Sequence, residues 1–257
     1  MARDETFETM HCAAQGHMAQ LDNYYHWILR NFGGAIGRRI WDAGAGIGSV
    51  TEHLARRADF VLATEFAQRN LEALRERFAN RPDVRVAYCD LARDDALAFA
   101  ECAIDTVISL DVLEHLEDDL HVLKTFWTVL QPEGRLLLKV PAHPFLYGAI
   151  DEASLHFRRY RRRDLGASLE RAGFRVERVA YMNMAATVPY FVKSRLLRRR
   201  TNFSNTIDPD RLGLVNRLVP WLERAERVLP VVFGLSLIAV GRKPGASESP
   251  ASDDASD

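Results

Sequence analysis

The 257-residue chain carries 34 Lys and Arg side chains against 35 Asp and Glu side chains, which gives a formal net charge of -1. This balance excludes a general electrostatic attraction to nucleic acid or to anionic lipid. The length suffices for one large domain, or for one domain with an insertion, around a single core. The three cysteines, Cys12, Cys89 and Cys102, share no close metal-type spacing, and the first residues form no apolar signal segment. We therefore expect a reduced, cytoplasmic protein.

The first element that the sequence predicts is a helix over residues 5–32. Apolar and aromatic side chains such as Tyr24 and Trp27 recur along it and give it one broad apolar surface, and Gly33 and Gly34 follow at its end. We expect residues 1–35 to form an N-terminal helical cap.

A glycine-rich turn follows a short apolar strand that ends at Asp42. Gly44, Gly46 and Gly48 fit a backbone that approaches a bulky ligand closely, because a Cβ would collide there and N–H groups at a helix start would face the ligand. The spacing differs from the Gly-x-Gly-x-x-Gly of dinucleotide sites, because Ser49 stands where the last glycine would be. The pattern predicts a nucleotide-binding turn and disfavours NAD.

The acid at Asp42 suits a ligand with an ammonium or sulfonium group better than one with a pyrophosphate. S-adenosylmethionine carries both of these cations. The sequence DAGAGIG, from Asp42 to Gly48, resembles the first motif of the class I S-adenosylmethionine-dependent methyltransferases, an acid-x-Gly-x-Gly-x-Gly turn. The resemblance implies a Rossmann-like fold and S-adenosylmethionine as the cofactor.

Strand and helix patterns alternate after the turn, which predicts a parallel sheet covered by helices on both faces. Glu65 ends the second strand, where a carboxylate can accept hydrogen bonds from both ribose hydroxyls of a nucleoside. After the fourth strand, the sequence DVLEHLEDD strengthens the resemblance to small-molecule methyltransferases. The first five strands are expected at residues 40–41, 60–64, 84–89, 103–110 and 135–140.

The resemblance also implies roles for particular residues. Asp90 is expected to meet the adenine amino group, and Leu110, Asp111 and Val112 are expected to line the methionine end of the cofactor. His115 either forms a hydrogen bond near the reacting methyl group or stabilises the turn. The N-terminal helix of the family lies over the cofactor cleft, so Tyr24 either contacts the substrate or packs on the domain. The cofactor-binding residues implied in this way are Asp42, Gly44, Ala45, Gly46, Gly48, Glu65, Phe66, Asp90, Leu91, Leu110, Asp111, Val112 and His115.

Residues 141–165 are expected to form an ordered loop at the carboxyl end of the fifth strand, where open α/β sheets place their chemistry. This loop is predicted to contact the methyl acceptor. Histidine can accept a proton near neutral pH, so His143 and His156 are the candidate catalytic bases. The candidate substrate contacts in the loop are Tyr147, Arg159 and Tyr160. No metal-ligand constellation is apparent, although Asp151 and His156 could contribute to one.

The last third of the chain is predicted to complete a seven-stranded methyltransferase sheet. The sixth and seventh strands are expected at residues 175–181 and 235–240, and the resemblance implies that the seventh is antiparallel. About fifty residues separate them, more than a hairpin needs, so residues 183–233 are predicted to be a helical lid insertion. The core is then formed by residues 36–182 and 234–244, and residues 245–257 are expected to be a disordered acidic tail.

The predicted function is methyl transfer to an oxygen, nitrogen or carbon nucleophile of a small-molecule acceptor, of a secondary-metabolite or sugar type. The base-amine motif Asn/Asp-Pro-Pro-aromatic is missing after the fourth strand, which disfavours nucleic acid as a partner. Three alternatives stay open: a lipid-linked acceptor reached by peripheral membrane contact through residues 188–200, a non-catalytic cofactor-binding protein, and an RNA methyltransferase. The sequence does not determine the oligomeric state.

Overall fold

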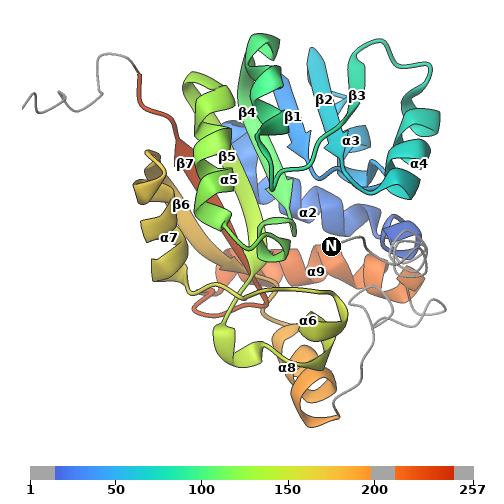
Figure 1. The fold of residues 1–257 in the computed structure, drawn as a ribbon. Coiled ribbons are helices and arrows are strands. Elements are labelled where there is room, and N and C mark those ends of the chain that lie inside the picture. Colours follow the sequence, from blue (N-terminus) through green and yellow to red (C-terminus); the bar gives the residue numbers. More distant parts are fainter. Residues whose placement is uncertain (1–14, 198–211, 246–257) are drawn as a thin grey trace, which may run out of the picture.

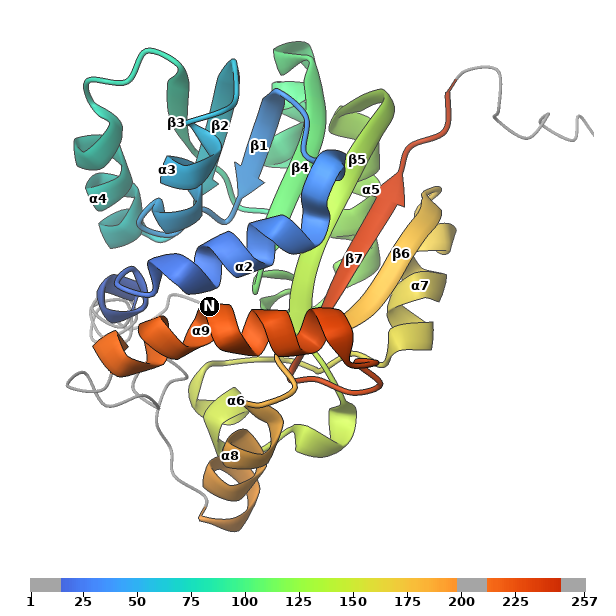
Figure 2. The same ribbon diagram turned by 180° about the vertical axis from the view of Figure 1, so that it is seen from behind.

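The computed structural model describes residues 15–197 and 212–245 and shows one mixed sheet with helices on both faces (Figures 1 and 2). The sheet has seven strands in the order β3-β2-β1-β4-β5-β7-β6. Neighbouring strands from β3 to β5 are parallel, and β7 is antiparallel to both β5 and β6. The strands are β1 (Arg39–Ala43), β2 (Phe60–Glu65), β3 (Val84–Tyr88), β4 (Ile104–Leu110), β5 (Leu130–Pro141), β6 (Arg175–Met182) and β7 (Ser236–Arg242).

The predicted fold class, a seven-stranded Rossmann-like sheet with an antiparallel seventh strand, is confirmed. The α-helices are α2 (Asp22–Phe32), α3 (Ser49–Leu54), α4 (Gln68–Phe78), α5 (Asp119–Val129), α6 (Ala149–Ala153), α7 (Arg162–Arg171), α8 (Thr187–Phe191) and α9 (Leu212–Val228). The 3-10 helices are η1 (Gly33–Ala35), η2 (Asp94–Cys102), η3 (Leu113–His115) and η4 (Pro144–Leu146), and η5 (Val192–Leu196) is a π-helical turn.

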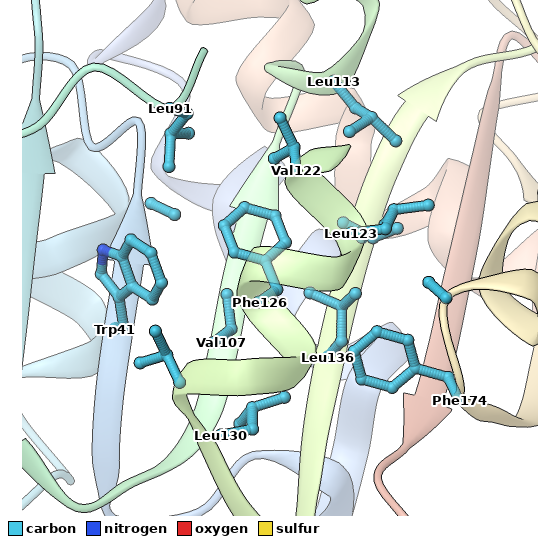
Figure 3. Packing of buried hydrophobic residues seen from close by; sticks show 14 of the residues in the cluster. Trp41, Leu91, Val107, Leu113, Val122, Leu123, Phe126, Leu130, Leu136 and Phe174 are labelled. Atoms are coloured by element: carbon cyan, nitrogen blue, oxygen red, sulfur yellow. The ribbon is translucent and has the colours of Figure 1, made fainter. Parts of the chain in front are cut away.

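Successive side chains of the central strands point to opposite faces of the sheet and divide the core into two layers. In β1, Trp41 packs with Phe126 of α5 on one face (Figure 3). The neighbouring Ile40 packs with α2 and α3 on the other face. Successive side chains of a strand point to opposite faces, so an almost continuous apolar strand supplies both layers. One face is covered by η2, α5 and α7, and the other by α2, α3, α4 and α9.

Helices α8 and α9 and the turn η5 lie between β6 and β7 in the chain. Helix α9 runs beside α2 across one face of the sheet (Figure 2). Asn23 donates a 2.9 Å side-chain hydrogen bond to the Asn216 carbonyl oxygen, and Arg30 forms an ion pair with the buried Glu223. Two elements that are far apart in sequence therefore form one layer.

The prediction of one continuous helix over residues 5–32 is wrong. Residues 15–18 are helical, and a separate helix, α2, begins at Asp22. Leu21 between them leaves helical geometry (φ −90°, ψ 56°) and is 2% exposed. The chain bends at this buried residue, which lets Gln15 reach the glycine turn while α2 packs on the sheet.

Some predicted features lie outside the described residues: the start of the N-terminal cap, the basic residues 198–200 and the tail from residue 246. Within residues 15–197 and 212–245, no helix combines the length and the apolar character needed to cross a bilayer.

Candidate active site

A cavity of about 460 Å³ opens at the carboxyl ends of the central parallel strands. Asp42 lies near the end of β1, Glu65 ends β2, Leu110 ends β4 and Lys139 is near the end of β5, and all four line the cavity. Open α/β sheets bind ligands at this edge. The cavity has two sides, which we name the glycine-turn side (residues 42–67 and 89–92) and the Asp151 side (Asp151, His156, Arg159 and Tyr190).

Close packing explains two of the glycines on the glycine-turn side. Gly44 and Gly46 have positive φ values of 79° and 58°, a region that L side chains rarely adopt. A Cβ on Gly44 would lie 2.5 Å from a methyl carbon of Val112, and one on Gly46 would lie 2.5 Å from Oε1 of Gln15. Both glycines and Ala45 line the cavity, as the sequence predicts for a ligand-binding turn.

Gly48 has a different reason to be glycine. It does not line the cavity, and with a φ of 85° it precedes α3. A Cβ there would lie 2.5 Å from the Phe78 ring and 2.7 Å from Leu74. The structure therefore assigns Gly48 to packing between the turn and α4, not to the direct ligand contact that its place in the motif predicts.

Glu65 fixes the glycine turn and faces the cavity. Its carboxylate accepts hydrogen bonds from the backbone N–H of Gly46, Phe66 and Ala67, each at 2.9 Å. The side chain is 7% exposed. Three backbone donors hold the carboxylate at the end of β2, so its orientation is set before any ligand arrives.

Asp42 is the second buried acid on this side. It is 3% exposed and accepts a 2.6 Å hydrogen bond from the Thr51 hydroxyl of α3. Burial raises the pKa of Asp42 to about 7, with Glu65 adding repulsion and the Thr51 hydrogen bond opposing the shift. A cation placed beside Asp42 would restore its charge.

The other cofactor-binding residues implied by the sequence lie around the same cavity. Asp90 accepts a 3.0 Å hydrogen bond from the Ala92 backbone and has Arg93 at 3.3 Å. At the end of β4, Asp111 has a positive φ of 55° and forms an ion pair with the buried Lys139. Phe66, Leu91, Leu110, Val112 and His115 also line the cavity.

Lys139 is a buried cation that lines the cavity. Its Nζ lies 2.6 Å from one Asp111 oxygen and 5.9 Å from the centre of the Tyr24 ring. Burial disfavours the charge of Lys139, but the Asp111 carboxylate outweighs it and raises the lysine pKa above its usual value. Tyr24 of α2 lines the cavity beside this pair, so the structure brings this predicted substrate contact to the site.

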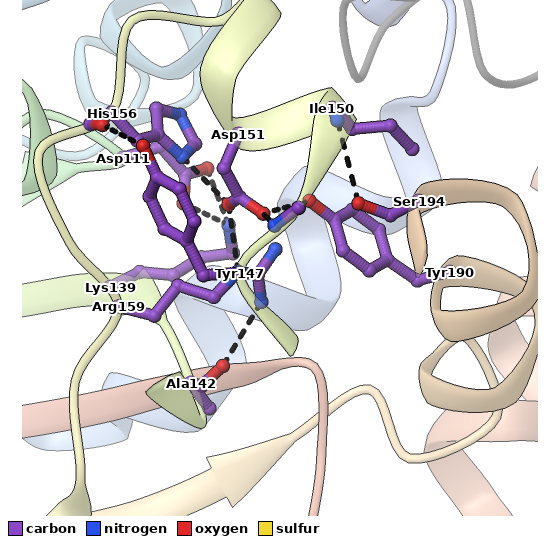
Figure 4. A network of polar contacts seen from close by, with 11 residues as sticks. Asp111, Lys139, Ala142, Tyr147, Ile150, Asp151, His156, Arg159, Tyr190 and Ser194 are labelled. Carbon is purple, nitrogen blue, oxygen red and sulfur yellow. Dashed lines mark hydrogen bonds and ion pairs between the residues drawn. The ribbon is translucent and has the colours of Figure 1, made fainter. Parts of the chain in front are cut away.

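Asp151 is the centre of the opposite side (Figure 4). It has no exposed surface and accepts hydrogen bonds from Arg159 Nε at 2.7 Å and the Tyr190 hydroxyl at 2.8 Å. Its Oδ1 also lies 3.0 Å from Nδ1 of His156. Although burial alone would raise it, these partners, His156 first, hold the pKa of Asp151 below its usual value. The network orients His156 and Arg159, both of which line the cavity.

Three residues predicted for the acceptor lie outside the cavity lining. The His143 ring stacks on Tyr181 at 4.8 Å and lines a separate hollow beside α7. The Tyr147 hydroxyl donates to the His156 carbonyl oxygen at 2.8 Å, and the Tyr160 hydroxyl donates to Asp119 at 3.0 Å. Tyr147 and Tyr160 therefore brace the loop that carries His156, and His143 is directed away from the other candidates.

Comparison with known proteins gives the same fold and the same motif region. Residues 41–138 match the family model described as a methyltransferase domain. The ubiquinone biosynthesis O-methyltransferase of Aeromonas salmonicida is 30% identical over 112 residues, which are 44% of this chain and 47% of that protein. Residues 41–138 thus resemble a methyltransferase domain. It spans about half the length of the curated relatives that it matches.

Solved structures extend the likeness to nearly the whole fold. A chain of the Haloferax volcanii complex that contains the Trm112 methyltransferase activator matches with a TM-score of 0.64 and 16% identity, over 95% of this chain and 100% of that chain. An S-adenosylmethionine-dependent methyltransferase from Mesorhizobium loti matches with a TM-score of 0.55 and 16% identity, over 83% and 95% of the two chains. At these identities the likeness concerns the fold alone.

The structure adds residues that the sequence did not single out. Lys139 stands inside the apolar stretch RLLLKV, and a lone charge in a buried strand was the signal that could have found it. Glu114 is 1% exposed and lines the cavity, and burial raises its pKa to about 7. Gln15 and Tyr190 reach the cavity from segments with no motif, so tertiary structure alone reveals them.

Proposed function

We propose that this methyltransferase binds S-adenosylmethionine on the glycine-turn side of the cavity and transfers its methyl group to a hydroxyl oxygen of a small-molecule acceptor on the Asp151 side. One observation carries the proposal: a single cavity is lined both by the glycine turn with Glu65 and by the imidazole that Asp151 holds. Donor and acceptor can then meet in one enclosed space.

Different carboxylates would bind different parts of the cofactor. We assign Glu65, at the end of β2, to the ribose hydroxyls and Asp90, two residues after β3, to the adenine amino group. Asp42 and Asp111 supply negative charge for the ammonium group of the methionine part. Four acids and one buried lysine line this cavity region, which favours a cationic ligand over a pyrophosphate.

The methyl donor is already activated, so the protein mainly has to align the two reactants. Alignment supplies roughly 7 to 11 kcal/mol in favourable cases, and a base adds about 100- to 10,000-fold for a hydroxyl acceptor. We assign the proton transfer to His156, because its Nδ1 is held by Asp151 and its other ring nitrogen is left for the acceptor. The name of the Aeromonas salmonicida relative, an O-methyltransferase, supports oxygen as the acceptor atom.

Labelled methyl transfer tests the proposal. Purified protein is incubated with S-adenosylmethionine that carries an isotopically labelled methyl group and with small-molecule extracts, and the labelled products are analysed by mass spectrometry. We expect a labelled O-methyl product with the wild type and none with Glu65→Ala, which loses the ribose ligand. Label found only on nitrogen or carbon would refute the oxygen assignment, and no label despite cofactor binding would refute the enzyme.

An acceptor attached to lipid is the second candidate, and one surface favours it. Leu214, Leu218 and Trp221 are exposed along α9, with Arg217 between the two leucines and Arg224 after Trp221. Apolar and basic side chains on one helix are typical of attachment to a membrane surface. Flotation with anionic liposomes that Trp221→Ser abolishes would support this candidate, and no flotation at low salt would eliminate it.

A further inference from the structure

Three potential metal ligands converge at the Asp151 side of the cavity. Glu114 and His115 belong to η3, and His156 comes from the loop after α6. One ligand atom from each lies within 4.8 Å of the other two. All three residues line the cavity, and the His115 and His156 rings lie edge to face with 4.6 Å between their centres.

The carboxylate of Glu114 is the first sign that this cluster binds a cation. The residue is 1% exposed, and its Oε2 is buried without a hydrogen bond from any residue that the structure describes. An ionised carboxylate without a partner is costly in such surroundings. Lys139, a buried cation that lines the same cavity, is bound to Asp111 instead. A metal ion would supply the missing positive charge.

His156 has the support that metal-binding histidines usually have. Its Nδ1 lies 3.0 Å from a carboxylate oxygen of Asp151, and Arg159, Tyr190 and the Gly148 backbone hold that carboxylate in turn. A carboxylate on one ring nitrogen fixes the tautomer and leaves the other nitrogen as a donor for a metal. Asp151 is therefore placed to orient His156 without binding the ion itself.

The two segments that supply the ligands are joined by their backbones. Phe157 donates its N–H to the Glu114 carbonyl oxygen at 2.8 Å, and the Tyr160 hydroxyl oxygen lies 3.3 Å from the Leu113 carbonyl oxygen. Ligand atoms about 2.1 Å from one tetrahedral ion lie about 3.4 Å apart, so closure from the present spacing takes only small side-chain rotations. The cluster is organised before an ion arrives.

We propose that Glu114, His115 and His156 bind one divalent first-row transition-metal ion in the cavity. Two imidazoles and a carboxylate suit Zn²⁺, Mn²⁺, Fe²⁺ or Co²⁺ better than Ca²⁺ or Mg²⁺, which prefer oxygen ligands. Three protein ligands leave a coordination position open toward the acceptor. The inference rests on the proposed function and changes one step of it. His156 would hold an ion that binds the acceptor oxygen and makes its hydroxyl more acidic, so the proton would pass to water instead of to the imidazole.

Metal titration tests the site without any methyl transfer. Tag-free protein, stripped with a chelator, is titrated with Zn²⁺ by calorimetry and with Co²⁺ by visible absorption, and S-adenosylhomocysteine affinity is measured on the same samples. We expect one ion per chain and a Co²⁺ spectrum typical of nitrogen and oxygen ligands. Glu114→Gln and His156→Asn should each weaken binding by more than 10-fold, and Asp151→Asn by about 10- to 100-fold.

A second cluster on the surface provides the matched control. Asp22, His26 and His53 also bring three ligand atoms within 4.8 Å of one another, but Asp22 is exposed. His26→Gln should leave the affinity for Zn²⁺ unchanged. Absence of Zn²⁺ binding, or a loss caused by His26→Gln and not by Glu114→Gln or His156→Asn, would overturn the metal site. Because S-adenosylhomocysteine binding is measured separately, failure of the metal site and failure of the cofactor site are told apart.

Discussion

The two sides of the cavity are built from the chain in different ways. On the glycine-turn side, Asp42 lies near the end of β1, the glycines follow that strand, and Glu65 ends β2. Backbone N–H groups hold Glu65 in place. On the Asp151 side, the network joins the loop after β5 to α8 of the insertion, through Tyr190. A compact motif can specify the first side, but only the folded chain creates the second.

The largest expected effect separates the two histidines that the sequence offered as bases. His156→Asn should lower kcat by about 100- to 10,000-fold, because it removes the group that acts on the acceptor hydroxyl. Its affinity for S-adenosylhomocysteine should stay close to that of the wild type, since the glycine-turn side is intact. His143→Asn should keep most of the activity, because that ring lies outside the cavity. Equal losses in the two variants, measured with labelled cofactor, would contradict this distinction.

Asp151→Ala should reveal how strongly the fold depends on this buried acid. It leaves the buried Arg159 guanidinium and the Tyr190 hydroxyl without their partner, and breaking a buried ion pair costs about 3 to 5 kcal/mol of unfolding free energy. Urea unfolding measures this loss. The control is Glu177→Ala, whose ion pair with Arg135 lies at the surface and should cost no more than about 1 kcal/mol. Similar losses for the two variants would show that the Asp151 network does not stabilise the fold.

Asp42 allows a test of the opposite side through pH. Its folded-state pKa is raised from 3.8 to about 7, so folding favours the neutral acid, and the unfolding free energy falls as pH rises between these values. Asp42→Asn removes this dependence. Relative to the wild type, the variant should gain roughly 2 to 4 kcal/mol between pH 4 and pH 8, as measured by urea unfolding. A difference that does not change with pH would mean that Asp42 is ionised throughout.

Gly48→Ala should have the smallest effect and should separate packing from ligand contact within one motif. The positive φ of 85° alone costs about 1 to 2 kcal/mol for alanine, and the Phe78 and Leu74 side chains have to move. S-adenosylhomocysteine affinity should change less than in Gly46→Ala, which alters the cavity lining. Gly166→Ala in α7 is the control, because a Cβ there meets open space and alanine favours a helix. A Gly48→Ala protein as stable as Gly166→Ala would contradict the packing role.

These contrasts also show how much of the fold and of the site could be predicted from the sequence. The seven strands and the carboxylates of the glycine-turn side could be predicted, because alternating apolar patterns and strand ends are local signals. The charge of Lys139 inside an apolar strand is visible in the sequence, but its partner is not, and Glu114 has no such signal, because their surroundings form only after β4 and β5 pair. The placement of His143 could not be predicted either, because its positive φ of 61° and its stacking on Tyr181 of β6 depend on tertiary structure.

Calorimetric titration of S-adenosylmethionine and S-adenosylhomocysteine tests the central claim most directly. Both ligands should bind the wild type with one site per chain, and Glu65→Ala, which removes the carboxylate that holds the turn and faces the ribose, should lose most of the affinity. The Asp151-side variant His156→Asn should bind both ligands nearly as the wild type does. If ligand-free wild-type protein binds neither compound, the glycine-turn side is not a site for this cofactor, and the proposed function fails with it.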